Sequence, residues 1–448
     1  MFQKKRVPNS IGGDVSPQSR QRLTRYLFAP MLFVAAVGGI YIRQPAFFTA
    51  PRFWAEEGKV YFAYALSHPW YYVLLTPHPN FGYYSLLNNL AAVVAALVPL
   101  EYAPLLTTLF ALSIQLFPIG IILWGRSALF EDLPRRVFVT LIMLFTLSTR
   151  EIWLNTTNSQ FYLLLVAALI LAERIEQGGR FKVWVYRLLL ILAGLSSPTM
   201  IVLAPCFFVK AWFEKRREYR IHAAIITGTS LIQIVAFFFA PNRSQIAAKR
   251  LSELDLPTFA HIIWSRTIVL PLAGLRHAND FADRSLSLQQ ADPQRFWIQG
   301  VLLLLLAIVL IAVLVWPVRD YRPVLLIAGA YCAVICFTIV TAITHDKKFV
   351  LIYPEWSPRY FYVPSVLLLL LIVSACRRGS GYFEHARAGI CLLLTISAIV
   401  FGVISYRETV DFAPDWPNWQ QEVARYRADP AYSELQIWPP GWSVKIGE

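Results

Sequence analysis

Two adjacent carboxylates, Glu56 and Glu57, are the residues of this 448-residue chain best suited to acid–base chemistry. They follow Trp54 and lie shortly after the first long apolar run. A carboxylate that is partly buried near a like charge has a raised pKa and can deprotonate a hydroxyl group at neutral pH. The pair could also bind a divalent cation such as Mg²⁺ or Mn²⁺, so the sequence leaves a need for a metal open. The simpler alternative is that both acids begin a solvated helix, because acidic residues favour the first turn.

A second candidate is the pair Arg359 and Tyr360, which begins one of the last apolar runs. An arginine at this position would lie at the outer membrane surface, where its planar guanidinium can bind a lipid phosphate through two parallel hydrogen bonds. The alternative is that both side chains anchor the protein in the interface, which is a common role of arginine and tyrosine. The sequence leaves these two roles open.

The segment 241–296 carries many basic residues, among them Arg266 and Arg276. Its middle, from Thr258 to Leu275, is apolar enough to form an interfacial or re-entrant helix, which would bring both arginines close to lipid headgroups. Basic residues are unusual on the outer side of a membrane, although long loops cross largely regardless of charge. An anionic phospho-lipid donor or acceptor would explain their presence.

The composition indicates which kind of scaffold must position these residues. Hydrophobic residues make up 57% of the chain and charged residues only 15%, whereas soluble domains contain about 25% charged residues. About eleven to thirteen spans of about 20 residues would account for this hydrophobic share. The sequence therefore predicts an all-α polytopic membrane protein, and it argues against a soluble enzyme, a disordered chain or a transmembrane barrel.

The net charge of +14 does not indicate a nucleic-acid partner. The basic residues fall in short clusters between apolar runs, as the positive-inside rule describes, so the predicted partner is the lipid bilayer. Residues 1–25 form a basic N-terminus that we expect to stay in the cytoplasm. Residues 26–406 form the transmembrane module, and residues 407–448 form an extracytoplasmic tail.

Outer loops are predicted at 43–82, 241–296 and 344–359, with interfacial helices in the first of them. The run 184–212 could form two short helices broken at Pro198, so the number of spans between residues 83 and 213 stays open. The apolar runs lie near 26–42, 83–99, 103–124, 136–149, 158–175, 184–212, 221–240, 297–316, 323–343, 360–375 and 388–406.

Part of this pattern resembles the GT-C superfamily of integral membrane glycosyltransferases. The resemblance is carried by the tryptophan and the acidic pair in the first outer loop, by the predicted interface helices, and by the entry into the next span, Pro77-His78-Pro79-Asn80-Phe81-Gly82-Tyr83-Tyr84. Members of this superfamily use lipid-phosphate-linked sugars and typically have a catalytic acid in that first loop. The layout is similar over the N-terminal half of the chain.

The resemblance implies roles for single residues of the first loop. Glu57, which precedes Gly58, matches the catalytic acid of the family better, and Glu56 would support it. Many members have an aspartate at one of these positions, so the choice between the two glutamates stays open. Trp54, His78 and Asn80 would contact the substrate.

The resemblance also extends to the segment 151–160, which corresponds to the second polar loop of the family. Asn158 and Gln160 stand where some relatives have an acidic residue. As amides they could hydrogen-bond a sugar or the reacting carboxylate, but they could not act as bases.

Near the late span, Arg359 and Tyr360 resemble an arginine–tyrosine pair that several members carry. The implied role is to bind the donor phosphate, with Arg266 and Arg276 in support.

The function that the resemblance implies is transfer of a sugar from a polyprenyl-phosphate donor to a hydroxyl group of a cell-envelope glycan or glycolipid. The transfer would invert the sugar carbon and take place on the outer face of the membrane. The basic N-terminus and the small cytoplasmic part fit a bacterial inner membrane with a periplasmic site, and an endoplasmic reticulum protein with a lumenal site would have a similar sequence. A rival interpretation is a transporter or flippase of a lipid-linked or anionic solute, which would usually show ionisable residues at mid-membrane depth. Here such residues lie at the ends of the predicted spans, with Arg187 as an ambiguous exception. The sequence does not distinguish the enzyme from a noncatalytic subunit of a glycan assembly complex.

Overall fold

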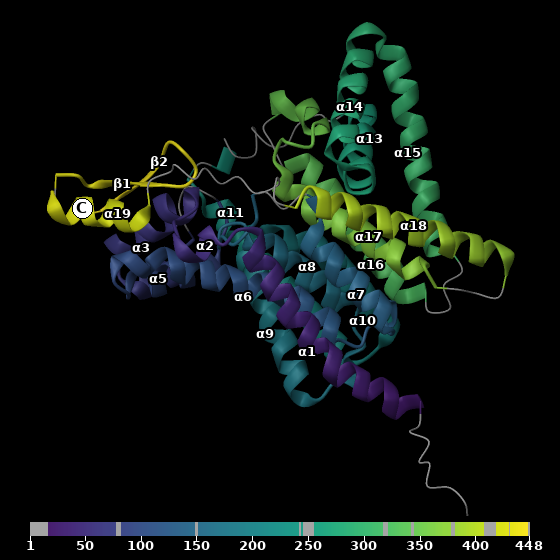
Figure 1. Cartoon of the computed structure of the whole chain (residues 1–448), viewed down its shortest axis with the longest axis horizontal. Coiled ribbons are helices and arrows are strands. Elements are labelled where there is room, and N and C mark those ends of the chain that lie inside the picture. Colours follow the sequence, from purple (N-terminus) through teal and green to yellow (C-terminus); the bar gives the residue numbers. More distant parts are fainter. Residues whose placement is uncertain are drawn as a thin grey trace, which may run out of the picture.

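The computed structural model is almost entirely helical, apart from a single antiparallel pair of strands near the C-terminal end of its described part (Figure 1). It describes residues 17–77, 82–147, 151–241, 243–244, 255–316, 321–341, 345–377, 381–406, 418–429 and 431–446.

The elements before residue 241 range from single turns to long rods, and the label η marks 3₁₀ or π-helical segments. They are α1 (Pro17–Arg43), α2 (Ala46–Thr49), η1 (Glu57–Phe62), α3 (Ala63–Ser67), α4 (Trp70–Leu75), α5 (Leu86–Ala96), η2 (Leu100–Tyr102), α6 (Ala103–Trp124), η3 (Ala128–Phe130), α7 (Leu133–Phe145), α8 (Ser159–Ala172), η5 (Ile175–Gln177), α9 (Arg180–Ser196), η6 (Pro198–Leu203), α10 (Ala204–Glu214) and α11 (Arg217–Phe239).

The remaining elements include most of the long apolar helices. They are α13 (Leu256–Ile263), η7 (Trp264–Val269), α14 (Leu270–Ala291), α15 (Pro293–Val315), α16 (Tyr321–Thr341), η8 (His345–Ile352), η9 (Pro358–Phe361), α17 (Tyr362–Ala375), α18 (Tyr382–Ile404), α19 (Trp419–Ala428), β1 (Glu434–Ile437) and β2 (Trp442–Lys445).

Seven helical stretches of the described chain are long and apolar enough to cross a membrane. They are Leu100–Trp124, Arg217–Phe239, Leu256–Ala291, Pro293–Val315, Arg322–Thr341, Pro358–Ala375 and Tyr382–Ile404. The prediction of an all-α polytopic membrane protein is therefore confirmed.

Among the described residues, several of the other predicted apolar runs form shorter helices. Helices α7, α9 and α10 have 13, 17 and 11 residues, and the 14-residue α8 is among the shorter apolar helices. The predicted break at Pro198 is present, since α9 ends at Ser196 and α10 begins at Ala204.

Helices α8 and α17 form the centre of the protein. Every residue of α17 is buried, and so is every residue of α8 except Gln160. A helix that is apolar on all sides is surrounded either by lipid or by other helices, and here other helices surround both. Helices α6, α9 and α16 pack around α8, and α7, α16 and α18 pack around α17. This centre fixes the positions of the segments that enter and leave both helices.

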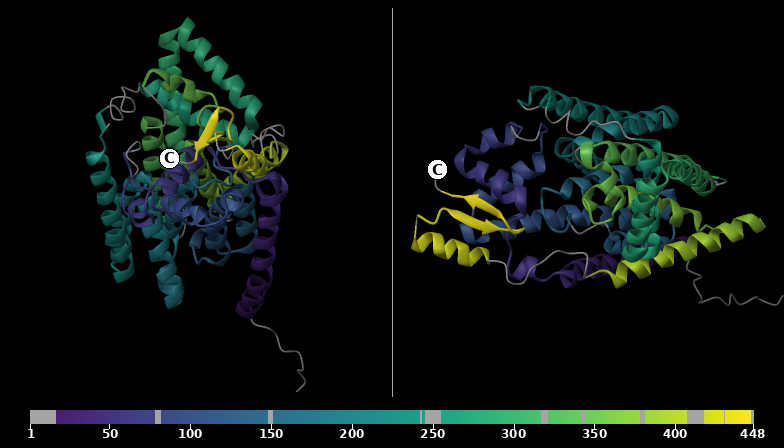
Figure 2. Two further views of the ribbon diagram at one scale, coloured as in Figure 1. Left: turned by 90° about the vertical axis from the view of Figure 1, so that its left-hand side faces the viewer. Right: turned by 90° about the horizontal axis from the view of Figure 1, so that it is seen from above.

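The segment predicted as the outer loop 241–296 is helical from Leu256 to Ala291, and with α15 it forms a hairpin that rises from the other helices (Figures 1 and 2). The apolar part ends at Gly274, whose φ of 85° is one that residues with a side chain rarely adopt. A Cβ atom there would lie 2.7 Å from the ring of Phe401. Along α15, large apolar side chains such as Leu305 and Val309 are exposed, as expected for a surface in contact with lipid.

The C-terminal strands and α19 pack on the first outer loop, at one end of the molecule (Figure 1). Phe53, Trp419 and Ile437 are fully buried in their shared apolar core. Gly58 allows the close approach, because a Cβ atom at this position would lie 2.7 Å from the Cβ of Phe53 and 2.8 Å from the side chain of Ile437. The tail from residue 418 onward is thus a folded cover on the loop that carries Glu56 and Glu57.

Replacing Trp419 with alanine should destabilise this cover by about 3–5 kcal/mol, the usual cost of truncating a buried tryptophan. The Trp419 ring meets Phe53 edge-on at 5.1 Å, and its Nε1–H donates to the carbonyl of Leu100 at 2.7 Å. Thermal unfolding of the purified protein in detergent measures the change. The matched control is Trp212→Ala, because Trp212 is exposed on α10 and its loss should change the midpoint little. Equal midpoints for both variants would contradict the assignment of Trp419 to a structural core.

Candidate active site

A cavity of about 400 Å³ lies between the first outer loop, α8, η6, α11, α16 and η9. Five of the residues singled out in the sequence line it together, namely Glu56, Asn158, Gln160, Arg359 and Tyr360. The other lining residues are Gly82, Tyr83, Thr157, Phe161, Leu164, Pro198, Thr199, Ile201, Gln233, Ile234, Phe237, Phe238, Phe337, Thr338 and Thr341. These segments are far apart in the sequence, and the packing of α16 and η6 around α8 brings them to one place.

The cavity is amphipathic. The ionisable groups Glu56 and Arg359 come from the first outer loop and from η9, while Phe237 and Phe238 of α11 and Phe337 of α16 supply apolar wall. Along α8 the lining runs from Asn158 to Leu164, a rise of about 9 Å at 1.5 Å per residue, so it passes from polar to apolar groups. Such a wall suits a ligand with a charged head and a hydrocarbon tail.

Arg359 is the cation of this cavity. Its Nη1 lies 3.5 Å from Oε2 of Glu151, and Glu56 is also within electrostatic range. The guanidinium carbon lies 5.2 Å from the ring centroid of Tyr360, and this ring meets Phe161 edge-on at 5.5 Å. These contacts fix the direction of the arginine while leaving it partly exposed to the cavity.

The segment between Glu151 and Asn158 is a tight turn stabilised by its own amides. The side chains of Asn155 and Asn158 both donate to the carbonyl of Glu151 at 2.8 Å. Oδ1 of Asn155 accepts from the backbone N–H of Asn158 at 2.9 Å, and the backbone at Leu154 has a positive φ of 49°. Thr157 of this turn lines the cavity, and its buried hydroxyl has no hydrogen-bond partner among the described residues.

Glu57 does not line the cavity, although the sequence favours it as the catalytic acid. Its side chain is buried, and its carboxylate accepts hydrogen bonds from Thr156 N–H at 2.8 Å, Thr156 Oγ1–H at 2.6 Å and Trp54 N–H at 3.1 Å. Burial raises the pKa of the Glu57 carboxyl, and the hydrogen bonds from Thr156 and Trp54 oppose that shift. A carboxylate with these partners has a structural role: it joins the first outer loop to the 151–158 turn.

Glu56, one residue earlier, is half-buried and faces the cavity. Among the described residues it has no hydrogen bond that would occupy its carboxylate in the way that Thr156 occupies Glu57. Of the two acids, Glu56 is therefore the one that a ligand in the cavity can reach.

Arg266 and Arg276, predicted as phosphate ligands, lie outside the cavity lining. Arg266 is fully buried in η7, where it donates to the carbonyls of Tyr353 and Trp356 and lies 4.1 Å above the ring of Phe361. It thus stabilises the segment that leads to Arg359. Arg276 is exposed on α14.

The remaining predicted substrate ligands of the first loop are not found in the cavity wall. Trp54 is half-buried beside Trp438, with ring centroids 6.4 Å apart, and its backbone forms a bridge with that residue of the tail. His78 and Asn80 lie outside the described residues.

The part of the chain that is described contains no group of three or more His, Cys, Asp or Glu residues arranged to hold a metal ion. Glu56 and Glu151 are the acids close to Arg359. Mg²⁺ often binds one or two carboxylates together with substrate phosphates, so it needs no larger cluster. A divalent cation thus remains a prediction.

The structure adds residues that the sequence did not single out. Glu151 orients Arg359, and Thr157, Tyr83 and Gln233 contribute to the wall. The sequence does contain a sign of the role of Gln233, because a polar amide within an apolar membrane span requires a hydrogen-bond partner. It exchanges hydrogen bonds with the backbone of Tyr84 at 3.0 and 2.9 Å. The sequence contains no comparable signal for Thr157.

Replacing Glu57 with glutamine should lower stability by about 2–4 kcal/mol, because the new amide nitrogen would face N–H and O–H donors in a buried site. Glu56→Gln is the matched control and should change stability by less than about 0.5 kcal/mol, since Glu56 is half-buried and unbonded. Thermal unfolding in detergent compares the two. If the two glutamine variants unfold at the same temperature as wild type, the structural role of Glu57 is refuted.

Comparison with known proteins gives no relative from which a function could be transferred. The chain matches no protein-family model, no curated protein and no solved structure. The role of the cavity is therefore inferred from its own residues.

Proposed function

We propose that the protein is a membrane glycosyltransferase of the GT-C type. It would transfer a sugar from a polyprenyl-phosphate donor to a hydroxyl group of a cell-envelope glycan or glycolipid. The observation that carries this proposal is the cavity itself, in which a reachable carboxylate, Glu56, and an oriented cation, Arg359, share an otherwise largely apolar wall.

The three parts of a polyprenyl-phosphate sugar donor each match a part of the cavity wall. Its isoprenoid chain would lie against Phe237, Phe238 and Phe337, and its phosphate would lie beside Arg359. The sugar would then lie near Thr157 and Gln160, whose hydroxyl and amide groups can hydrogen-bond its ring substituents. Sites for small molecules commonly combine apolar walls with a few well-placed polar groups in this way.

The reaction needs one base and one cation. Glu56 would take the proton of the acceptor hydroxyl as its oxygen forms a bond to the anomeric carbon of the sugar. The bond between that carbon and the phosphate oxygen breaks, and the phosphate leaves with the electron pair. Arg359 would stabilise the charge that develops on the leaving phosphate, and Glu151 keeps this arginine in place. Attack from the face opposite the phosphate inverts the sugar carbon.

We assign the base to Glu56 because of its surroundings. A general base must lie within hydrogen-bond reach of the proton that it removes. Glu57 does not line the cavity, and its carboxylate accepts three hydrogen bonds from Thr156 and Trp54, whereas Glu56 lines the cavity. Glu57 would thus support the reaction only by holding the first outer loop in place.

The cellular setting proposed for this activity is a bacterial inner membrane. With the basic N-terminus in the cytoplasm, the cavity and the first outer loop would face the periplasm. The donor and the acceptor would both reach the site from the membrane or from the outer face.

Glu56→Gln should reduce sugar transfer by about 10²- to 10⁴-fold, the usual contribution of a general base, with thermal stability unchanged. The assay offers the purified protein in nanodiscs a panel of polyprenyl-phosphate sugars with a glycolipid extract. Glu355→Gln is the matched control, because Glu355 bonds Asn279 at 2.9 Å outside the cavity and its replacement should preserve transfer. Retained transfer by Glu56→Gln would refute the assignment of the base.

The same assay tests the enzyme itself. If the wild-type protein binds a lipid-linked donor but transfers no sugar from any member of the panel, the proposal fails. A transporter or a noncatalytic subunit would then explain the cavity.

Arg359→Ala should weaken use of the donor by about 10- to 100-fold, because it removes charge-assisted hydrogen bonds to the phosphate. Arg359→Lys keeps the positive charge but not the two parallel N–H donors. The use of the donor should therefore be weakened less in Arg359→Lys than in Arg359→Ala. Measuring KM for the donor and kcat for each variant separates binding from turnover. If KM and kcat are unchanged in both variants, Arg359 does not bind the donor, and its role is to anchor the protein in the membrane interface.

A further inference from the structure

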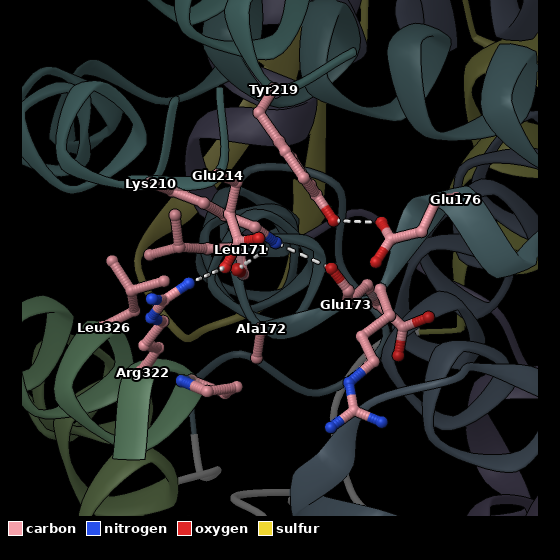
Figure 3. Close-up of a pocket in the computed structure, with 11 residues that line it drawn as sticks. Leu171, Ala172, Glu173, Glu176, Lys210, Glu214, Tyr219, Arg322 and Leu326 are labelled. Carbon is pink, nitrogen blue, oxygen red and sulfur yellow. Dashed lines mark hydrogen bonds and ion pairs between the residues drawn. The ribbon is translucent and has the colours of Figure 1, made fainter. Parts of the chain in front are cut away.

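A second cavity, of about 380 Å³, is shown in Figure 3. It lies at the opposite ends of two helices that line the first cavity. The first cavity contacts the start of α8 and the end of α16, whereas the second contacts the end of α8 and the start of α16. It is lined by Leu171, Ala172, Glu173, Arg174, Glu176, Lys210, Glu214, Tyr219, Arg322, Pro323 and Leu326.

The centre of this cavity is the ammonium group of Lys210. The side chain is buried, and Nζ donates to the carbonyls of Leu171 and Glu173, both at 2.6 Å (Figure 3). Nζ also lies 4.3 Å from the ring centroid of Tyr219. The lysine thus caps the carbonyl end of α8, where the helix dipole favours a cation. In its protonated form the side chain has three N–H groups, and within the described chain the third has no hydrogen-bond acceptor.

Two acids in the wall of the second cavity, Glu173 and Glu176, already accept hydrogen bonds from other residues. Oε2 of Glu173 accepts from Lys182 Nζ at 2.8 Å, from Tyr186 Oη at 3.0 Å and from the backbone N–H of Arg126 at 2.7 Å. Oε2 of Glu176 accepts from Tyr219 Oη at 2.5 Å. Glu173 therefore has little remaining capacity for a ligand, whereas Glu176 accepts one hydrogen bond, from Tyr219.

Arg322 is the most available cation of the wall. Its closest described partner is Glu214, with 3.6 Å between Nη1 and Oε1, and both side chains are partly exposed. Half of the Arg322 side chain is exposed, and this ion pair occupies only one edge of the guanidinium, so further N–H groups are left for another acceptor. The donors available in this cavity are thus the guanidinium of Arg322 and the third N–H of Lys210. The carboxylate of Glu214, which accepts no hydrogen bond within the described chain, is the acceptor that a ligand at Arg322 would have to displace.

The surroundings indicate where an acceptor-rich ligand could enter. Leu171, Pro323 and Leu326 form an apolar edge, and the adjacent Leu325 is exposed on α16. A further basic group, Lys215 to Arg217, follows directly after Glu214 and is exposed. Basic pockets between membrane helices commonly bind anionic lipid headgroups.

We propose that this second cavity binds a phosphate ester, and that its source is the headgroup of an anionic phospholipid in the adjacent leaflet. The phosphate would take the place of Glu214 at Arg322 and would accept the third N–H of Lys210. The apolar edge at Leu326 would contact the glycerol and the first carbons of the acyl chains. This inference does not depend on the proposed transferase activity, because no lining residue is shared with the first cavity.

The experiment titrates the full-length protein in detergent with dihexanoyl phosphatidylglycerol and follows its thermal unfolding. Dihexanoyl phosphatidylcholine and inorganic phosphate are the parallel titrants. We expect phosphatidylglycerol to raise the unfolding temperature of wild type at lower concentrations than phosphatidylcholine does. Arg322→Ala and Arg322→Glu should weaken this effect about tenfold or more, because each removes a charge-assisted hydrogen bond.

Arg220→Ala is the matched control, since Arg220 is exposed at the same end of the molecule but does not line the cavity. An equal loss in Arg220→Ala would show that surface charge binds the lipid, and the site would be refuted. Equal effects of inorganic phosphate and phosphatidylglycerol would keep the phosphate site and overturn its lipid source. No shift with either anion, or a wild-type response in both Arg322 variants, would overturn the proposal entirely.

Discussion

The buried carboxylate of Glu57 is the constraint on which the candidate site depends. A charge in an apolar setting is stable only if hydrogen-bond donors surround it, and here they come from the first outer loop and from Thr156, 99 residues further along the chain. Because the turn that contains Thr156 also contains Thr157 and ends at Asn158, this single group fixes one wall of the cavity. It also fixes Glu56, its neighbour in sequence.

The tail strengthens the same constraint from the outside. Trp419 and Ile437 bury the apolar side of the loop, and Gly58 gives them the space to approach. The first outer loop, which would be mobile as an isolated segment, is thus held between the 151–158 turn on one side and a small folded cover on the other. The proposed role of Glu56 as a base would require this kind of rigid support.

Helix α8 relates the two cavities to each other. Its middle is apolar on all sides and is surrounded by other helices, so it presents polar chemistry only at its two ends. At its start the amides and hydroxyls of the 151–158 turn face the first cavity, and at its end free carbonyls attract Lys210. The buried Arg266 has a comparable supporting role, since it binds the carbonyls that precede Arg359. In both places a buried cation shapes a binding wall by satisfying backbone oxygens.

The sequence by itself determined the helical membrane scaffold, because long apolar runs with few charges have no other stable arrangement in a bilayer. It also determined most of the helix positions, the break at Pro198, and the candidate residues Glu56, Asn158, Gln160, Arg359 and Tyr360 that the cavity brings together. Only the tertiary structure decided which of two adjacent glutamates faces the cavity, since that depends on hydrogen bonds to a turn distant in sequence. The same reason applies to Arg266 and Arg276. Arg266 binds backbone carbonyls in the core, and Arg276 is exposed on the surface. The sequence does not distinguish these two environments, because they depend on how the helices pack.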